Sequence, residues 1–277
     1  MPDAPHHPRL LRHTPGTREP LGKNAAHRFA SQHALVHYGS GTVFTFIPKN
    51  ACTSLRISLA LANGAIATVE EWNWVHKNNA TFAATLPELA RAPETALVLR
   101  CPFRRLASTF LDKIVSRQPD FWALYDRSAR EIDPDRLTFR GFVDWIGRPG
   151  MLRANIHWRP QEDFLVYARY DHVFGMTGLD AFAAFFAQRT GHDHVDSRKF
   201  SGHTSAGFVP LEGGCQADTP LVELMVAKAR GALPRAVDLF DDALAGQVAR
   251  LYGRDLALLR DLARDAPLLF PEYGEEP

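Results

Sequence analysis

The spacing of apolar residues along the chain predicts strands that alternate with helices. β-Branched and aromatic residues fill positions 43–47, a composition typical of a buried strand, and the run Thr-Ala-Leu-Val-Leu at 95–99 predicts a second one. Weaker alternation over residues 34–38, followed by a glycine-containing turn, predicts a hairpin with the first of these strands. After Thr53 the apolar positions recur at helical spacing until Gly64, which predicts a helix stop. Further helices are predicted at 86–91, 102–117, 119–130, 139–147, 179–189 and from 219 onward, and further short strands at 164–168 and 172–175.

This alternation predicts an α/β fold with a central, mainly parallel sheet that is covered by helices on both faces. The chain of 277 residues is long enough to bury a substantial core. We see no internal repeat and no linker-like stretch. We therefore expect one domain over residues 31–277, preceded by a flexible tail over residues 1–30.

Composition and charge narrow the class of partner. The net charge of +1 gives no global field that would recruit nucleic acid or a membrane. Three cysteines do not make a disulfide framework, which fits a reducing cytoplasm. The first residues hold no apolar run of signal-peptide length, and no stretch reaches the roughly 18 apolar residues of a membrane helix. We expect a cytoplasmic protein without a transmembrane segment.

Residues 48–54 connect a predicted strand to the helix that follows it and read Pro-Lys-Asn-Ala-Cys-Thr-Ser. Pro48 ends the strand because it has no N–H for the ladder, and the turn directs backbone N–H groups and the positive end of a helix at one point. Such a point binds phosphate or sulfate, and Lys49 adds a cation. A plain turn with Thr53 or Ser54 as the helix N-cap explains the residues equally well. A Walker A loop does not, since it needs two glycines and a Lys directly before Ser or Thr.

A second polar segment follows the strand at 95–99 and reads Arg-Cys-Pro-Phe-Arg-Arg-Leu-Ala-Ser over residues 100–108. Arg100 leaves the sheet at the carboxyl end of its strand, where α/β proteins bind ligands. Ser108 lies about two turns into the next helix, so a guanidinium fork and a hydroxyl could reach one phosphate. Taken alone, the segment favours the alternative, in which Arg100 pairs with a carboxylate and Ser108 only packs.

Together, the two segments resemble the donor-binding motifs of the sulfotransferases, especially the carbohydrate type. That family has Pro-Lys-x-(Ala/Gly)-(Cys/Thr)-(Thr/Ser)-Ser at its 5′-phosphosulfate loop and Arg-Asp-Pro-Phe-Glu-Arg-Leu-x-Ser-x-Tyr-x-Asp-Lys at its 3′-phosphate motif. Cys101, Arg104 and Phe110 depart from the Asp, Glu and Tyr of the family, which spares the two phosphate contacts. Weaker similarity at 157–161, His-Trp-Arg-Pro-Gln, and at 251–255 extends the resemblance over about residues 43–260.

The resemblance implies a P-loop-NTPase-like sulfotransferase fold and, without a visible membrane anchor, a soluble member of bacterial type. It implies 3′-phosphoadenosine 5′-phosphosulfate as the donor, a carbohydrate or small-molecule acceptor with a hydroxyl or amine, and no metal. Lys49 would stabilise the charge on the leaving phosphate oxygen. The residues that the resemblance implies for the donor are Lys49, Asn50, Ala51, Cys52, Thr53, Ser54, Arg100, Ser108, Ser201 and His203.

On the acceptor side, the family places its base between the two donor segments, where this chain has His76. A His or Glu suits this role because its pKa can lie near the working pH. We expect His76 to be the base, although a surface or packing role explains it equally well, and His157 is the second candidate. Trp74 and Arg159 are further candidates for acceptor contacts.

Two other functions stay open at this point. A P-loop-like small-molecule kinase would share the strand, loop and helix, but it needs Mg²⁺ and carboxylates that hold the metal. A non-catalytic nucleotide- or glycan-binding protein would bind the donor and transfer nothing. The sequence has no recognisable pattern for the identity of the acceptor or for the oligomeric state.

Overall fold

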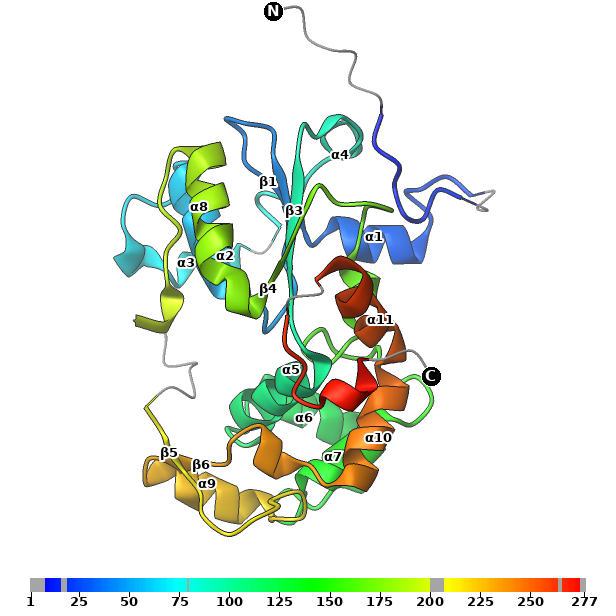
Figure 1. The fold of residues 1–277 in the computed structure, drawn as a ribbon, viewed down its shortest axis with the longest axis vertical. Coiled ribbons are helices and arrows are strands. Elements are labelled where there is room, and N and C mark those ends of the chain that lie inside the picture. Colours follow the sequence, from blue (N-terminus) through cyan, green and yellow to red (C-terminus); the bar gives the residue numbers. More distant parts are fainter. Residues whose placement is uncertain (1–7, 16–18, 79, 200–206, 264–265, 275–277) are drawn as a thin grey trace, which may run out of the picture. The chain divides into compact units, whose positions relative to one another are not determined.

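A computed structural model describes residues 8–15, 19–78, 80–199, 207–263 and 266–274 (Figure 1). The chain divides into two compact units. The first comprises Met1–Arg100, Gln161–Lys199 and Asp261–Ala266, and the second comprises Cys101–Pro160, Phe200–Arg260 and Pro267–Pro277. The single domain that we expect over residues 31–277 stays a prediction.

The first unit is built on a four-stranded sheet with the order β1-β2-β3-β4. The strands are β1 (Ala34–Val36), β2 (Val43–Thr45), β3 (Thr95–Leu99) and β4 (His172–Gly175). β1 runs antiparallel to β2, whereas β2 pairs with β3 and β3 with β4 in parallel. The structure thus confirms the hairpin and the mainly parallel sheet.

Helices cover both faces of this sheet. Successive side chains of a strand point to opposite faces, so neighbouring residues of β2 contact different helices. Phe44 is fully buried against three phenylalanine rings of α8 (Leu179–Thr190). Val43 instead packs in an apolar cluster with Ala30 of α1 (Ala25–Ser31). The α/β architecture is therefore confirmed. The other helices of this unit are α2 (Cys52–Ala62), α3 (Trp74–Lys77) and α4 (Leu86–Arg91), with short 3₁₀ helices at Val69–Glu71, Gln161–Phe164, Met176–Gly178 and Ser197–Lys199.

The N-terminal segment packs onto the first unit within the range that we expected to be a flexible tail. Leu11 is buried and forms an isolated antiparallel bridge with Tyr167. Arg9 lies within 2.8 Å of the Asp171 carboxylate.

The strand expected at 164–168 is wrong, because in this range only Tyr167 pairs, in its isolated bridge with Leu11. Residues 164–167 are buried, but the backbone of this run begins as the end of a 3₁₀ helix and then makes a single bridge.

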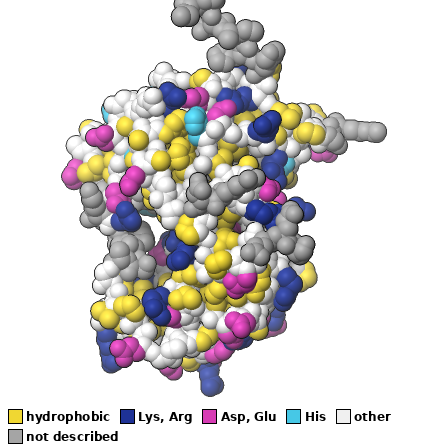
Figure 2. All heavy atoms as spheres, viewed as in Figure 1, with side chains coloured by type: hydrophobic (Ala, Val, Ile, Leu, Met, Phe, Trp, Pro, Cys, Tyr) yellow, Lys and Arg dark blue, Asp and Glu magenta, His cyan; other side chains and the backbone are white. Residues whose placement is uncertain are grey.

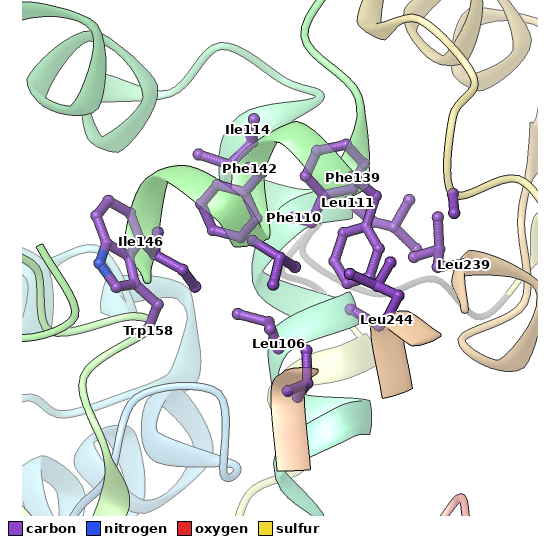
Figure 3. Close-up of a cluster of buried hydrophobic side chains, with 14 of the residues drawn as sticks. Leu106, Phe110, Leu111, Ile114, Phe139, Phe142, Ile146, Trp158, Leu239 and Leu244 are labelled. Carbon is purple, nitrogen blue, oxygen red and sulfur yellow. The ribbon is translucent and has the colours of Figure 1, made fainter. Parts of the chain in front are cut away.

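The second unit is mainly helical around an apolar core. Its elements are α5 (Pro102–Thr109), a π-helix (Phe110–Ile114), α6 (Pro119–Arg127), α7 (Phe139–Ile146), β5 (Val209–Pro210), α9 (Leu221–Ala229), β6 (Ala232–Leu233), a 3₁₀ helix (Val237–Leu239), α10 (Asp242–Leu251), α11 (Gly253–Leu262) and a 3₁₀ helix (Pro271–Tyr273). Figure 3 shows Leu106, Phe110 and Phe142 pointing into this core. The rings of Phe110 and Phe139 lie 5.0 Å apart. The helix expected over 102–117 thus changes from α to π geometry at a buried aromatic residue.

Charge on the surface is mixed. On the face shown in Figure 2, Lys and Arg side chains are interspersed with Asp and Glu, in keeping with the net charge of +1. Among the helices that the structure describes, none combines the length and hydropathy required to cross a lipid bilayer.

Candidate active site

The loop between β2 and α2 holds two residues in the left-handed backbone conformation. Lys49 has a φ of 73° and Ala51 a φ of 55°. Residues with a Cβ rarely adopt positive φ, because the Cβ approaches the backbone too closely, at a cost of about 1 kcal/mol or more each. Such strain persists only where the surrounding structure enforces it, typically at functional sites.

The start of α2 leaves several backbone donors open. The helix begins at Cys52, and its N-cap residue, Ala51, offers no side-chain hydrogen bond. The N–H of Leu55 makes the first bond of the ladder, to the Ala51 carbonyl. In the parts of the chain that the structure describes, the N–H groups of residues 51–54 have no hydrogen-bond acceptor. Neither Thr53 nor Ser54 caps the helix, so the cap expected in the plain-turn alternative is wrong. Open N–H groups at the positive end of a helix are the kind of geometry that binds anions, and an anion site here stays a prediction.

The loop after β2 and Arg100, the first residue of the second segment that we expect to bind phosphate, meet in the first unit. Arg100 follows β3, and its Nη1 donates a hydrogen bond of 2.7 Å to the backbone carbonyl of Lys49. Both residues are partly exposed. Because β2 and β3 are parallel neighbours, their carboxyl ends bring the loop and the guanidinium to one edge of the sheet.

Two buried amides lie beneath this contact. Asn50 Nδ2 donates to the Val98 carbonyl at 2.9 Å and to Gln161 Oε1 at 2.7 Å. The same Oε1 accepts from the N–H of Arg100 at 3.0 Å, and Gln161 Nε2 donates to the Arg100 carbonyl at 2.8 Å. Asn50 is 4% exposed and Gln161 is fully buried. Asn50, which the resemblance assigns to the donor, thus holds the loop to β3.

Ser54 is likewise engaged by the protein. It is buried, and its Oγ lies 2.8 Å from the Oγ of Ser197 and accepts from the Ser197 N–H at 3.1 Å. One turn further along α2, Ser58 Oγ accepts from the N–H of Val195 at 2.8 Å. These bonds fasten residues 195–197 to α2. The two predicted donor contacts beyond this segment, Ser201 and His203, lie outside the described residues.

The loop that carries His157 and Arg159 lies in the second unit, and its backbone is held by side chains. Each of the four carbonyls of residues 156–159 accepts a hydrogen bond from a buried side chain. The donors are Arg105 to residues 156 and 159, at 3.2 and 2.8 Å, Thr109 to residue 157 at 2.9 Å, and Tyr252 to residue 158 at 2.5 Å. The backbone conformation of this irregular loop is therefore held by buried side chains of the same unit.

His157 has a carboxylate partner in the second unit. Its Nδ1 lies 2.7 Å from Asp120 Oδ1, and Asn155 Nδ2 donates to the same oxygen at 2.8 Å. Burial alone would raise the pKa of Asp120, but the hydrogen bonds from His157 and Asn155 and the nearby charges of His157 and Lys113 outweigh it, so that this pKa lies below its usual value. An ionised carboxylate only accepts hydrogen bonds, so Nδ1 carries a proton, and in the neutral form of the ring Nε2 is then the acceptor.

The remaining predicted residues lie on short helices. His76 is exposed on α3, and its ring meets that of Trp72 edge-on at 5.6 Å. Trp74, on the same helix, packs against Phe82 at 5.8 Å. Ser108 is partly exposed on α5 in the second unit. The structure therefore brings together the loop of residues 49–54 and Arg100, and it places Ser108, His157 and Arg159 in the other unit.

Sequence reasoning missed three polar residues. Asp120, in the first turn of α6, resembles an ordinary acidic residue at the positive end of a helix. Asn155 lies in an irregular loop and Gln161 begins a short 3₁₀ helix, and the sequence shows no periodicity at either position. The one signal that could have marked Gln161 is its place at the end of the similar stretch at 157–161.

Residues 32–205 match the model of the sulfotransferase family, a span that covers more than half of the chain. The chain belongs to the sulfotransferase family. The matched span includes the loop after β2, Arg100, and the loop that carries His157.

One individual protein is also similar to this chain, at low sequence identity. Carbohydrate sulfotransferase 14 of Danio rerio is 25% identical over 178 residues, which cover 58% of this chain and 48% of the relative. The chain thus matches about half of the length of that protein. No solved structure matches the chain.

Replacing Ala51 with glycine tests the backbone strain. Because glycine adopts positive φ without steric cost, we expect Ala51→Gly to leave the free energy of unfolding unchanged or to raise it by up to about 1 kcal/mol. Ala60→Gly in the interior of the same helix should lower it by about 1 kcal/mol or more. Denaturant unfolding of both variants measures the difference. Equal losses would contradict the left-handed conformation of Ala51.

Replacing Asp120 with asparagine tests the pair with His157. Since the pKa of Asp120 is lowered in the folded state, the carboxylate stabilises the protein above its unfolded pKa of about 4, and this contribution disappears as the pH falls through the folded pKa. We expect Asp120→Asn to lose about 1–3 kcal/mol of unfolding free energy near neutral pH, and the difference from the parent should shrink below about pH 4.

Asp126→Asn is the matched control on the same helix. Asp126 is exposed and lies 3.7 Å from Arg130, so this change should cost little at any pH. A loss for Asp120→Asn that does not depend on pH would contradict the lowered pKa.

Proposed function

We propose that this chain transfers the sulfuryl group of 3′-phosphoadenosine 5′-phosphosulfate to a hydroxyl, or an amine, of a carbohydrate or small-molecule acceptor. The observation that carries the proposal is the loop after β2, which presents open N–H groups at a helix start and receives the Arg100 guanidinium at its Lys49 carbonyl. Membership in the sulfotransferase family and the similarity to a protein named carbohydrate sulfotransferase support the reaction class and the acceptor class.

The charge of the donor determines what the loop has to do. As the acceptor oxygen bonds to sulfur, the bond from sulfur to the phosphate oxygen breaks, and negative charge accumulates on the departing 3′,5′-bisphosphate. Preorganised N–H groups of residues 51–54 and the Lys49 ammonium stabilise this charge more in the transition state than in the ground state. Arg100 and Ser108 are proposed to bind the 3′-phosphate, which positions the donor throughout.

The proton of the acceptor needs a base. The position of His76 in the sequence predicts that it is this base. The geometry around His157 supports the other candidate. A histidine whose Nδ1 is held by an ionised carboxylate has a fixed tautomer with Nε2 as proton acceptor, as in other acid–base pairs. Asp120 provides such a carboxylate at 2.7 Å. We therefore place His157 ahead of His76 as the base.

Lys49→Ala tests the donor site. We expect donor-dependent sulfation to fall about 10²–10³-fold, mainly in kcat, because the ammonium acts on charge that develops in the transition state. The measurement is transfer of labelled sulfate from the donor to a panel of carbohydrate and small-molecule acceptors. Lys23→Ala, which removes an exposed lysine of the same unit, should leave the rate unchanged.

Two outcomes would contradict the proposed function. Full turnover in Lys49→Ala would remove this residue from the mechanism. Calorimetric binding of ATP–Mg²⁺ in preference to adenosine 3′,5′-bisphosphate would favour a kinase instead.

The choice of base is tested by comparing His157→Ala with His76→Ala. The variant that lacks the base should keep its affinity for adenosine 3′,5′-bisphosphate and lose about 10²-fold or more in kcat, the usual scale of acid–base assistance. We expect this result for His157→Ala. His192→Ala, at an exposed position, is the control. If only His76→Ala loses turnover, the base is His76.

A further inference from the structure

Gln161 lies at the point where the pairing of the central sheet ends. The last residue pair of β2 and β3 is Thr45 with Leu97, and that of β3 and β4 is Leu99 with Gly175. Arg100, the residue that follows β3, lies beyond both pairs, and in the described part of the chain no strand pairs with its peptide groups, although buried peptide groups need partners. Gln161 satisfies both groups of Arg100, because its amide accepts from the N–H and donates to the carbonyl, as a neighbouring strand would.

The same amide holds the loop after β2. Gln161 Oε1 accepts from Asn50 Nδ2 at 2.7 Å, and Asn50 Nδ2 also donates to the carbonyl of Val98. Among the described residues, the Oδ1 of Asn50 has no hydrogen-bond partner. The position of the Asn50 side chain therefore depends on two bonds, one of which Gln161 provides.

These contacts close a ring of interactions. Asn50 is covalently joined to Lys49, the Lys49 carbonyl accepts from the Arg100 side chain, the Arg100 backbone pairs with Gln161, and Gln161 accepts from Asn50. Asn50 and Gln161 are almost completely buried, and in such surroundings a satisfied hydrogen bond is strong and a missing one is costly. One side chain thus fixes the loop and Arg100 relative to each other.

We propose that Gln161 is a positioning residue of the donor site, which couples the loop of Lys49 to Arg100 so that the two phosphate-bearing ends of the nucleotide are bound as one ligand. The inference rests on the proposed function, since it assumes that the loop and Arg100 bind the two ends of one donor. Gln161 itself is fully buried and acts through Asn50 and Arg100.

Gln161→Met removes the amide at similar length. We expect the affinity of the full chain for adenosine 3′,5′-bisphosphate, measured by calorimetry, to fall about tenfold or more, which corresponds to the loss of one to two buried hydrogen bonds. Tyr167→Phe is the matched control. It removes a buried hydrogen bond of the same unit, from Tyr167 Oη to the Leu89 carbonyl, and should lower the melting temperature without changing this affinity.

A double-mutant cycle separates positioning from general stability. If Gln161 holds Arg100 in register with the loop, Arg100→Ala should cost at least about threefold less affinity in the Gln161→Met background than in the parent. Additive losses in this cycle would overturn the coupling.

Gln161→Glu provides a second test, which is sufficient by itself if Gln161→Met does not fold. A protonated carboxyl can donate to the Arg100 carbonyl as the amide does, whereas the ionised form cannot. The affinity for the bisphosphate, taken relative to the parent at each pH, should be near the parent value at low pH and fall as the introduced carboxyl ionises. A ratio that is constant with pH would overturn the inference.

The outcomes distinguish this inference from the proposed function. A parent protein that binds the bisphosphate, with a Gln161→Met variant that binds it equally well, overturns the role of Gln161 and leaves the function standing. A parent protein that does not bind the bisphosphate overturns the proposed function and this inference with it.

Discussion

The hydrogen bond from the Arg100 guanidinium to the Lys49 carbonyl is the contact on which the candidate donor site depends. It joins the segments that follow two neighbouring parallel strands, and it exists because β3 continues two residues past its last pair with β2. Beyond that pair, side chains take over the hydrogen bonding of the backbone. The sheet edge is therefore satisfied by groups that also set the geometry of the loop.

The same arrangement explains how the loop tolerates strain. Positive φ at Lys49 and Ala51 is unfavourable for residues with a Cβ, and the loop contains no glycine that would relieve it. Buried hydrogen bonds hold this conformation. Asn50 makes them at one end of the loop, and the hydroxyls of Ser54 and Ser197 make one at the other end. Strain, open N–H groups and a helix terminus thus coincide in one short segment. The N–H groups and the helix terminus favour an anion, and strain of this kind is typical of functional sites.

The sequence predicted the local parts of this picture well, because strands, helices and their order follow from periodicity. It predicted the hairpin, the parallel sheet and the two segments at the strand ends. The contacts that decide the site were not predictable in this way. Gln161 meets Arg100 from 61 residues away, and Asp120 meets His157 from 37. Such pairs depend on tertiary packing, which periodicity does not encode. The strand expected at 164–168 is wrong because an apolar run indicates burial but does not by itself determine the backbone conformation.

Similarity of a motif also does not say what each of its residues does. Arg105 matches the family pattern as well as Arg100 does, yet it is buried and donates to two carbonyls of the loop at residues 156–159. Tyr252, from the weaker similarity near the C-terminus, serves the same loop. A residue that matches a family motif can therefore bind a ligand, or it can hold the backbone of another motif in place. The degree of burial distinguishes the two cases, since a guanidinium that is 1% exposed and already bonded to carbonyls has no surface left for a phosphate.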